Sequence, residues 1–440
     1  MDIRPHTQQK FSILATLVLA FTLIASPLQA AEGRALTLDQ ALALAESGNH
    51  EIKKAREFSR LVEGKYLEER AGALPHFTLT GQVARQEGQN MFSAGETMTQ
   101  ESQSLSLGLT QALFTWGKLG AAIRAAAKGY LTADEELRLA RQDTRRLVTT
   151  AFYDILLARE EESIARQNLT QKESHRDEAG RRLALGVATD YDLLAAKVAV
   201  ENARPQVIRA ANQVRTARDQ LRYLIGTEED VDATGSLAVD YQPLPTFEQA
   251  LATARERRPE LLALSHRQAI ADELVTIARA EDKPRLDLNG GYGQERLDLG
   301  GISGSGPSWN AGVVLSFPFF DGMKTKGLVA QAASNRRSLT IDEEQLKESI
   351  SLEIRTGVNV ARETREIVTA LAGTVTQAEE LLAMAEKGFR LGVKIRLEVE
   401  DAELNLLQAR GNLARARRDH LVARVGLSRA MGVLGEGKGR

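Results

Sequence analysis

The chain has 440 residues, which is long enough for two or three domains of ordinary size. Its 57 basic and 59 acidic residues nearly cancel, so its overall charge does not favour nucleic acid as a partner. The absence of cysteine excludes disulfides, thiolate metal sites, cysteine nucleophiles and a lipid-modified N-terminal cysteine.

The N-terminus has the features of a secretion signal. Arg4 and Lys10 precede an apolar run from Phe11 to about Ala25, and small residues around Ala30 suit cleavage. The run covers about 15 residues, which is short for a membrane-spanning helix, although an uncleaved anchor is the alternative. The sequence therefore predicts a signal peptide at residues 1–30 and a mature protein outside the cytoplasm.

Beyond the signal, the chain contains an internal repeat. The stretch "LDQALALAESGNHEI" resembles "FEQALATARERRPEL", and further pairs follow in the same order at an offset of about 205 to 209 residues. The two repeats are predicted at residues 31–240 and 247–432, with the proline-marked linker "YQPLPT" at 241–246 and a short tail at 433–440. Each repeat is expected to contain a helix, two strands and two long helices.

Each strand pair shows a period of two residues. The pairs are expected at about residues 75–114 and 284–319, with apolar residues such as Leu79 and Val313 alternating with small or polar ones. Each segment is about ten residues long, as in membrane-crossing strands, and its faces suit a barrel with lipid outside and water inside. The polar, glycine-rich stretches "QEGQNMFSAGETMTQE" and "DLGGISGSGPS" are expected to be the loops that join each pair. A soluble hairpin with one face on a core is the alternative.

Four strands are too few to close a membrane barrel, for which about eight is the smallest number. Open strand edges are not tolerated in lipid, so several chains would have to share one barrel. Two chains would supply eight strands and three would supply twelve. The strand pattern by itself does not choose between these numbers.

After each strand pair, the chain changes from strand to helix at an aromatic and glycine junction. The helical run from about Lys118 to Leu183 contains no proline and could extend about 100 Å. Spacings of three, four and seven residues, which are typical of a coiled-coil seam, separate Leu137, Thr144, Val148, Ala151, Ile155 and Ala158. These helices should therefore pack side by side in water. The residues predicted to form the junctions are Phe114, Trp116, Gly117, Phe319, Phe320 and Gly322.

Each long helical run breaks at a Leu-Gly-Val sequence. The glycines are expected to turn the chain with positive φ, and Thr189 or Asp190 is expected to cap the helix after the first turn. Both turns are predicted to be hairpin tips far from the strands. Their exposed apolar residues are candidates for docking a partner, namely Leu185, Gly186, Val187, Leu391, Gly392 and Val393.

No motif for catalysis or cofactor binding is found in the sequence. The six histidines are scattered, and none of them has the helical spacing of a metal-ligand pair. The stretch "GVLGEGKG" lacks the Ser or Thr that follows lysine in a P-loop, and no nucleophile lies in context with a base. We therefore expect no enzymatic activity, no cofactor and no metal site.

The ordered repeat, the signal, the paired "FTWG" and "FFDG" junctions and the "RLALGVATDYDLL" and "FRLGVKIRLEVEDA" tips resemble the TolC family of outer-membrane efflux proteins. The resemblance implies a mainly α-helical homotrimer whose twelve strands form one outer-membrane barrel in lipid. Its helices would form a tunnel across the periplasm. The tips would dock on a periplasmic adaptor, or membrane fusion protein, bound to an inner-membrane pump. The chain would then be a passive exit duct for efflux or type I secretion.

The family also has acidic residues in the second tip motif, where they narrow the periplasmic entrance. The matching residues are Glu398 and Asp401, and Glu398 departs from the aspartate that the family commonly has. The corresponding first-repeat residues are Asp192 and Ala195, so the acidic pair is not duplicated. At positions i and i+3 the two acids share a helix face, where three copies would favour cations. A merely solvated helix face is the alternative.

Two other classes of protein are compatible with parts of this pattern. A soluble periplasmic coiled-coil adaptor or scaffold would share the signal and the helical seam, but it would not need ten-residue alternating strands. A periplasmic enzyme would need a convergent polar site, and none is recognisable. The sequence does not indicate whether the cargo is a drug, a metal ion or a protein.

Overall fold

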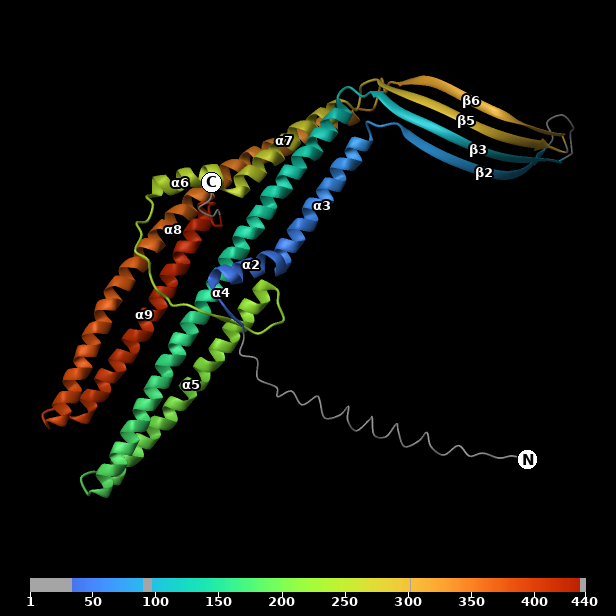
Figure 1. Ribbon diagram of the computed structural model, residues 1–440. Helices are drawn as coiled ribbons and strands as arrows, with labels where there is room; N and C mark the ends of the chain where they lie inside the picture. Colours follow the sequence, from blue (N-terminus) through green and yellow to red (C-terminus); the bar gives the residue numbers. More distant parts are fainter. Residues whose placement is uncertain (1–33, 90–96, 301, 436–440) are drawn as a thin grey trace, which may run out of the picture.

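The computed structural model describes residues 34–89, 97–300 and 302–435, so the predicted signal peptide lies outside the described residues. A four-stranded sheet lies at one end of an elongated molecule, and two long helical hairpins extend toward the other end (Figure 1). This arrangement confirms the predicted mainly helical fold with four long strands in each chain. Within the described ranges, no helix has both the length and the hydropathy of a transmembrane helix.

Each half of the chain contains two short helices, two strands and two long helices in that order. The first half comprises α2 (Leu38–Gly48), α3 (His50–Ala71), β2 (His76–Gln89), β3 (Thr97–Phe114), α4 (Lys118–Ala184) and α5 (Asp190–Ile225). The second comprises α6 (Phe247–Arg257), α7 (Pro259–Arg279), β5 (Arg285–Leu299), β6 (Ile302–Ser316), α8 (Lys324–Arg390) and α9 (Arg396–Ala430). Two short strands, β1 (Arg34–Leu36) and β4 (Val231–Ala233), pair in parallel beside the first half.

The expectation of one helix at the start of each half was wrong, because that segment divides into two. Asn49 has an extended backbone, and its side chain accepts hydrogen bonds from the first amides of α3. At the equivalent break, Arg258 is extended and Pro259 begins α7. A proline at the first helical position suits a new helix but cannot continue the previous one.

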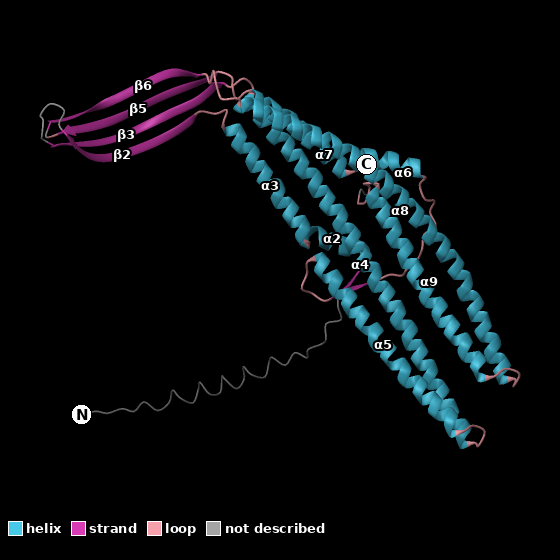
Figure 2. Ribbon diagram, turned by 180° about the vertical axis from the view of Figure 1, so that it is seen from behind, coloured by secondary structure: helices cyan, strands magenta, loops and turns pink. Residues whose placement is uncertain are grey.

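The four long strands form one antiparallel sheet in the order β2-β3-β5-β6 (Figure 2). The register places Leu79 opposite Leu107, Leu107 opposite Tyr292 and Tyr292 opposite Trp309. One face of the sheet is therefore apolar across all four strands, and these side chains are exposed to the surroundings. The opposite face carries small and polar residues, as the alternation predicted.

The loops between paired strands are shorter than the sequence suggested. The stretch "DLGGISGSGPS" was expected to be a loop, but most of it belongs to β5 and β6. Pro307 lies within β6 opposite Gln294, a position that is tolerated because β6 is an edge strand of the described sheet. Long-range pairing with β5 overrides the local preference of glycine and serine for loops.

The helices α4 and α8 each have 67 residues and extend about 100 Å. Each forms a hairpin with the helix that follows it, and the two hairpins lie side by side (Figure 1). The predicted seam of α4 is buried at Thr144, Val148, Ala151, Ile155 and Ala158, whereas Leu137 is only half-buried. The seam prediction is thus confirmed for five of its six residues.

The connection between the halves, residues 234–246, contains neither helix nor strand and is called the strap below. It includes the predicted linker and crosses from the first half to α6 (Figure 1). Leu237 anchors its beginning in the core formed by α2, α4 and α5, and Leu244 packs near its end against the α8 and α9 core. Thr246 then caps α6 by accepting a hydrogen bond from the Gln249 amide.

Candidate functional site

The two predicted tips lie at the same end of the molecule, away from the sheet (Figure 1). Gly186 and Gly392 have φ values of 74° and 75°, which confirms the predicted glycine turns. The amides of Val187 and Val393 donate to the carbonyls of Arg182 and Gly388, both at 3.0 Å, and so close the ends of α4 and α8. The two tips therefore share one backbone geometry.

The apolar residues of both tips are strongly exposed. Leu185, Val187, Leu391 and Val393 each expose more than two thirds of their surface in the single chain. Large apolar side chains are seldom so exposed at a turn that faces water. Exposed apolar residues that lie together commonly mark an interaction site. The tips thus have the chemistry of a docking surface.

The helices after the two tips are capped differently. Thr189 caps α5 with its hydroxyl, and Asp192 accepts a hydrogen bond from the Thr189 amide at 2.8 Å. At the second tip Ile395 has no side-chain oxygen, so Glu398 alone returns to accept from the Ile395 amide at 3.0 Å. Lys394 Nζ lies 2.5 Å from the same carboxylate.

The two predicted acidic residues, Glu398 and Asp401, therefore differ in their contacts. Lys394 and the Ile395 amide hold the pKa of Glu398 below its usual value, so this residue stays ionised but is partly compensated. Asp401 is exposed one turn further along α9. Among the described residues, no hydrogen bond or ion pair involves its side chain, which leaves Asp401 as the less compensated charge.

A buried polar cluster near the tips was not predicted. The Glu403 side chain on α9 is 4% exposed, and it accepts from Gln171, Lys172 and His175 of α4 at 2.6, 2.7 and 2.5 Å. Burial acts to raise the pKa of Glu403, but the contacts with His175 and Lys172 outweigh it and hold the pKa below its usual value. Glu403 lies between Val399 and Leu406 in the apolar seam of α9, and this spacing in the sequence could have identified it as a buried residue.

The two junctions between strand and helix have similar but not identical backbones. Trp116 and Gly117 both have positive φ, and so do Gly322 and Met323. The helices begin directly afterwards, so glycine occupies the second left-handed position in one half and the first in the other. A left-handed Trp or Met is strained, which indicates that the surrounding structure determines the turn.

The aromatic residues of the junctions are largely exposed. Phe114 and Trp116 pack edge to face with ring centroids 5.2 Å apart, and a bulge in β3 places Phe114 opposite Leu286. Phe319 and Phe320 are among the most exposed apolar residues of the described chain. Aromatic side chains at the end of an apolar band suit a boundary between lipid and water, and Trp116 also has an indole N–H that can face the water. In the described ranges, no group of three acidic or histidine side chains is arranged to hold a metal ion.

These features can be compared with known proteins. A model of the outer membrane efflux protein family matches residues 41–227 and again residues 250–433. The chain belongs to the outer membrane efflux protein family. The double match follows the internal repeat, and it assigns this efflux protein to a family of transport channels.

Two proteins of Pseudomonas aeruginosa are similar to this outer membrane efflux protein. Outer membrane protein OprJ is 26% identical over 82% of this chain and 76% of its own length. The alkaline protease secretion protein AprF is 27% identical over 76% of this chain and 71% of its own length. Outer membrane protein TolC of Escherichia coli is 23% identical over 92% of this chain and 83% of its own length.

Solved structures show the same fold. A membrane protein from Pseudomonas aeruginosa superposes with a TM-score of 0.77 at 24% identity, over 90% of this chain and 93% of that one. The MtrE outer membrane channel of Neisseria gonorrhoeae, solved in its open state, gives 0.75 at 22% identity, over 90% and 89%. The predicted resemblance to the TolC family and the predicted mainly helical fold with four long strands in each chain are confirmed.

Proposed function

We propose that three copies of this chain form a passive exit duct in the outer membrane, serving a tripartite efflux or type I secretion system. Its relatives are named as an outer membrane protein, as the outer membrane protein of a toluene efflux pump and as a protease secretion protein, which supports both the place and the role. The observation that carries the proposal is the open four-stranded sheet, apolar on one complete face and continuous with long polar helices. The duct performs no chemistry, so a partner supplies the energy.

The edges of the single chain support assembly with further copies. In the sheet, β2 and β6 each have one unpaired side, which lipid would not tolerate. In the helical part, α5 and α8 carry exposed apolar residues at helical spacing, among them Leu194, Val198 and Ile208 on α5 and Leu352, Val360 and Ile367 on α8. If β2 pairs with β6 of the next copy and α5 packs against α8 of that copy, both edges are closed, and one rotation relates the copies. Three copies give the twelve strands that the family resemblance implies.

The apolar face of the sheet would then contact outer-membrane lipid, with the aromatic junctions at the periplasmic boundary. The helices would enclose a tunnel in the periplasm. The exposed Leu and Val residues of the two tips would dock on a periplasmic adaptor that connects the duct to an inner-membrane pump. Glu398 and Asp401 would surround the entrance as the gate, with Asp401 as the dominant charge because Lys394 compensates Glu398.

Single-channel conductance of the purified chain in a planar bilayer tests this proposal. We expect small, cation-selective steps that grow or lose selectivity in Glu398→Gln/Asp401→Asn, with most of the change already present in Asp401→Asn. The matched control is Asp192→Asn, which makes the same kind of change at the first tip and should leave selectivity unchanged. Steps that the double variant does not alter would move the gate elsewhere. Folded protein that never inserts would overturn the duct and favour a soluble periplasmic adaptor or scaffold.

A further inference from the structure

A buried histidine lies in the second helical hairpin. His420 of α9 is 1% exposed and faces α8, where its Nδ1 lies 3.1 Å from the hydroxyl oxygen of Thr364. At an offset of 206 residues, which also relates the two tip glycines, the first hairpin has Val214, and Val214 is buried as well. Valine therefore satisfies the packing at this position, so a histidine there needs another explanation.

Two arginines flank His420, and both of them hold the strap. Arg424, one turn further along α9, donates from Nη1 to the Asp240 carbonyl oxygen at 2.6 Å. Arg365 of α8 places its guanidinium 5.7 Å from the centroid of the Tyr241 ring, within reach of a cation–π contact. The two polar contacts that attach Asp240 and Tyr241 of the strap to the hairpin are thus made by arginines that face the buried imidazole.

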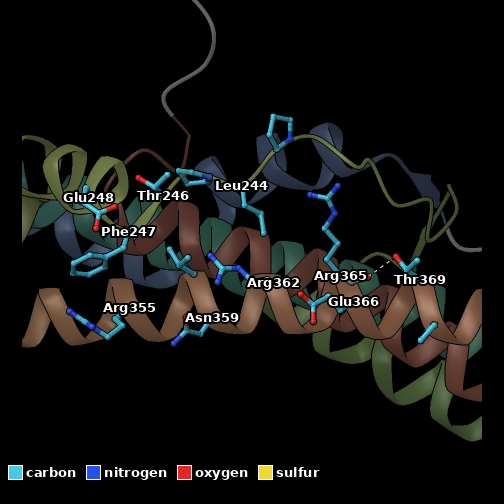
Figure 3. Close-up of a pocket in the computed structure, with 14 residues that line it drawn as sticks. Leu244, Thr246, Phe247, Glu248, Arg355, Asn359, Arg362, Arg365, Glu366 and Thr369 are labelled. Carbon is cyan, nitrogen blue, oxygen red and sulfur yellow. Dashed lines mark hydrogen bonds between the residues drawn. The ribbon is translucent and has the colours of Figure 1, made fainter.

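Val239 also packs on the hairpin, against Val368 and Leu413, but two cavities lie beside the strap. A cavity of about 1100 Å³ lies between residues 243–248 and the face of α8 that carries Arg362 and Glu366 (Figure 3). A second cavity of about 800 Å³ is lined by strap residues from Gly235 to Tyr241 and by Arg410 and Arg417. Water-sized space along both stretches allows the strap to move without opening the helical core.

We propose that His420 is an acid-sensitive release for the strap, because its protonation adds a third positive charge beside Arg365 and Arg424 in a buried site. The repulsion displaces the two arginines from Tyr241 and Asp240, and this middle stretch of the strap detaches from the α8–α9 hairpin. The protonated imidazole cannot reach water while the helices stay packed. Moving the two long, flexible arginine side chains is therefore the easier response.

The charged groups that face His420 set the direction of the pH dependence. Burial, followed by Arg424 and Arg365, lowers the pKa of His420 below the 6.5 of an ordinary histidine. On the α8 side the Ala361 carbonyl accepts a hydrogen bond and acts weakly against this. On the α4 side Tyr153 faces Arg424, and burial raises the pKa of its hydroxyl, so that it is neutral.

The sign of the effect follows from this lowered pKa. The unfolded chain binds the proton more readily than the folded chain does. The stabilisation from neutral His420 is therefore complete above about pH 6.5 and is lost as pH falls through the folded-state value. The strap is held at neutral pH and released in acid. A consequence for gating, through the hairpin that carries Glu398 and Asp401, rests on the proposed function, whereas the release itself does not.

A distance measurement on the full chain tests the release. The chain has no cysteine, so nitroxide labels at Ala238→Cys on the strap and Glu363→Cys on α8 give a background-free pair. Labelled chains diluted into unlabelled protein in detergent are measured by double electron–electron resonance between pH 7.5 and 5.0. We expect one short distance at neutral pH and a longer, broader population in acid. The ratio of the two should change by at most about tenfold per pH unit, as for one proton.

Three variants sharpen the test. His420→Gln keeps a neutral polar group and should abolish the acid response, whereas His266→Gln, at a half-buried histidine of α7, should leave it unchanged. Arg424→Gln keeps a donor for Asp240 but removes one charge, so it should move the midpoint to higher pH even if His420→Gln does not fold. An unchanged distance in acid, or a response that persists in His420→Gln, would overturn the proposal. Because conductance is measured separately, a failed duct and a failed release remain distinguishable.

Discussion

In each half of the chain, the break between the two short helices packs against the end of the last long helix, but the residues at this junction differ between the halves. In the first half, the break between α2 and α3 meets the end of α5, backbone against backbone. A Cβ on Gly48 would lie 2.1 Å from the Ile225 carbonyl oxygen, and one on Gly226 would lie 2.3 Å from the Gly48 carbonyl oxygen. Asn49 completes this neutral junction by donating to the Leu224 carbonyl at 2.7 Å.

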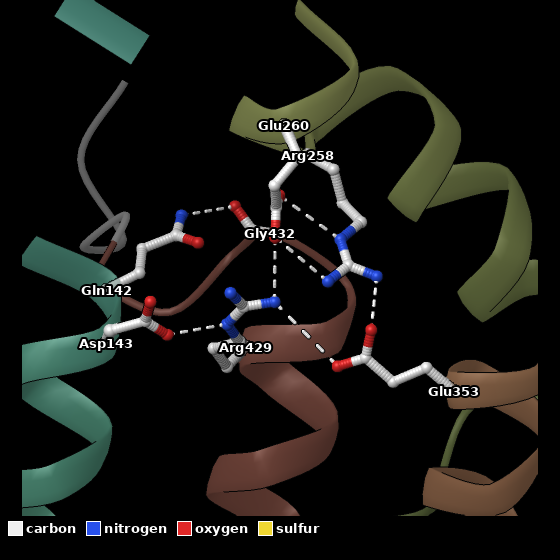
Figure 4. Close-up of polar contacts among 7 residues, drawn as sticks. All are labelled: Gln142, Asp143, Arg258, Glu260, Glu353, Arg429 and Gly432. Carbon is white, nitrogen blue, oxygen red and sulfur yellow. Dashed lines mark hydrogen bonds and ion pairs between the residues drawn. The ribbon is translucent and has the colours of Figure 1, made fainter. Parts of the chain in front are cut away.

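In the second half, Gly432 takes the place of Gly226, and Arg258 takes the place of Asn49. The Arg258 side chain is 4% exposed and pairs with Glu260 and with Glu353 of α8. Arg429 of α9 joins the same cluster and reaches Asp143 of α4 at 2.8 Å (Figure 4). The Gly432 carbonyl also accepts from Gln142 of α4, at 2.8 Å.

The chemistry of each junction matches the helices that it connects. The neutral junction closes one half onto itself, so short backbone contacts suffice. The charged junction lies where α4 of the first half meets α7, α8 and α9 of the second, and longer side chains are needed to span four helices. A buried charge cluster adds little net stability but is costly to break, because each remaining charge loses its partner. The charged junction should therefore resist partial separation of the halves.

The largest expected effect concerns the neutral junction. Gly226→Ala should destabilise the chain by at least about 3 kcal/mol, because φ is 69° and the added Cβ overlaps the Gly48 carbonyl. Gly373→Ala is the matched control, since a Cβ there meets nothing within 4 Å and should stabilise α8 by about 0.5 to 1 kcal/mol. Denaturant unfolding followed by circular dichroism measures both. Equal stability of the two variants would contradict the close approach.

Next in size is the contrast between Arg258 and Asn49. Arg258→Met should cost about 3 kcal/mol, because it removes the most buried cation of the cluster and leaves Arg429 as the one remaining cation for both Glu260 and Glu353. Asn49→Ala should cost about 1 to 2 kcal/mol, from a lost helix cap and an unsatisfied carbonyl. The same unfolding measurement decides this. If Asn49→Ala proves the more costly of the two, the charged junction is not the stronger connection.

A smaller, pH-dependent effect separates the two junctions further. Burial acts to raise the pKa of Glu260, but Arg258 and Arg429 outweigh it and hold the pKa below the 4.5 of an ordinary glutamate. The stabilisation from ionised Glu260 is thus present above about pH 4.5 and is lost as pH falls through the lowered value. The cost of Glu260→Gln, measured at pH 7 and pH 3.5, should shrink in acid, whereas that of Asn49→Ala should stay constant. Parallel behaviour of both variants would count against this assignment.

The smallest expected effect compares the two tips. Thr189→Ala removes the hydroxyl cap of α5 and should speed hydrogen exchange of the Asp192 amide by about threefold or more. Lys394→Met removes only an exposed ion pair with Glu398, so exchange at the start of α9 should change by about twofold at most. Mass spectrometry of the full chain at one pH compares the two. A larger response at the second tip would show that Lys394, not the Ile395 amide, holds the Glu398 carboxylate.

Features that depend on neighbouring residues could be predicted from the sequence. The repeat, the strand alternation, the long α4 run and the turns at Gly186 and Gly392 all follow from local periodicity and from the freedom of glycine at positive φ. Thr189 was expected as a cap for the same reason, since its hydroxyl needs only amides a few residues away. The resemblance to the TolC family rested on these local features in their order.

Features that depend on residues far apart in the sequence could not be predicted and became visible in the folded chain. Pairing with β5 turned the expected glycine-rich loop into part of β6, and the approach of α4 made Glu403 a buried partner of Lys172 and His175. Neither Arg258 nor His420 differs in sequence from a surface residue. Their roles arise because the helices around them come from both ends of the chain, and local periodicity does not encode which helix covers a given side chain.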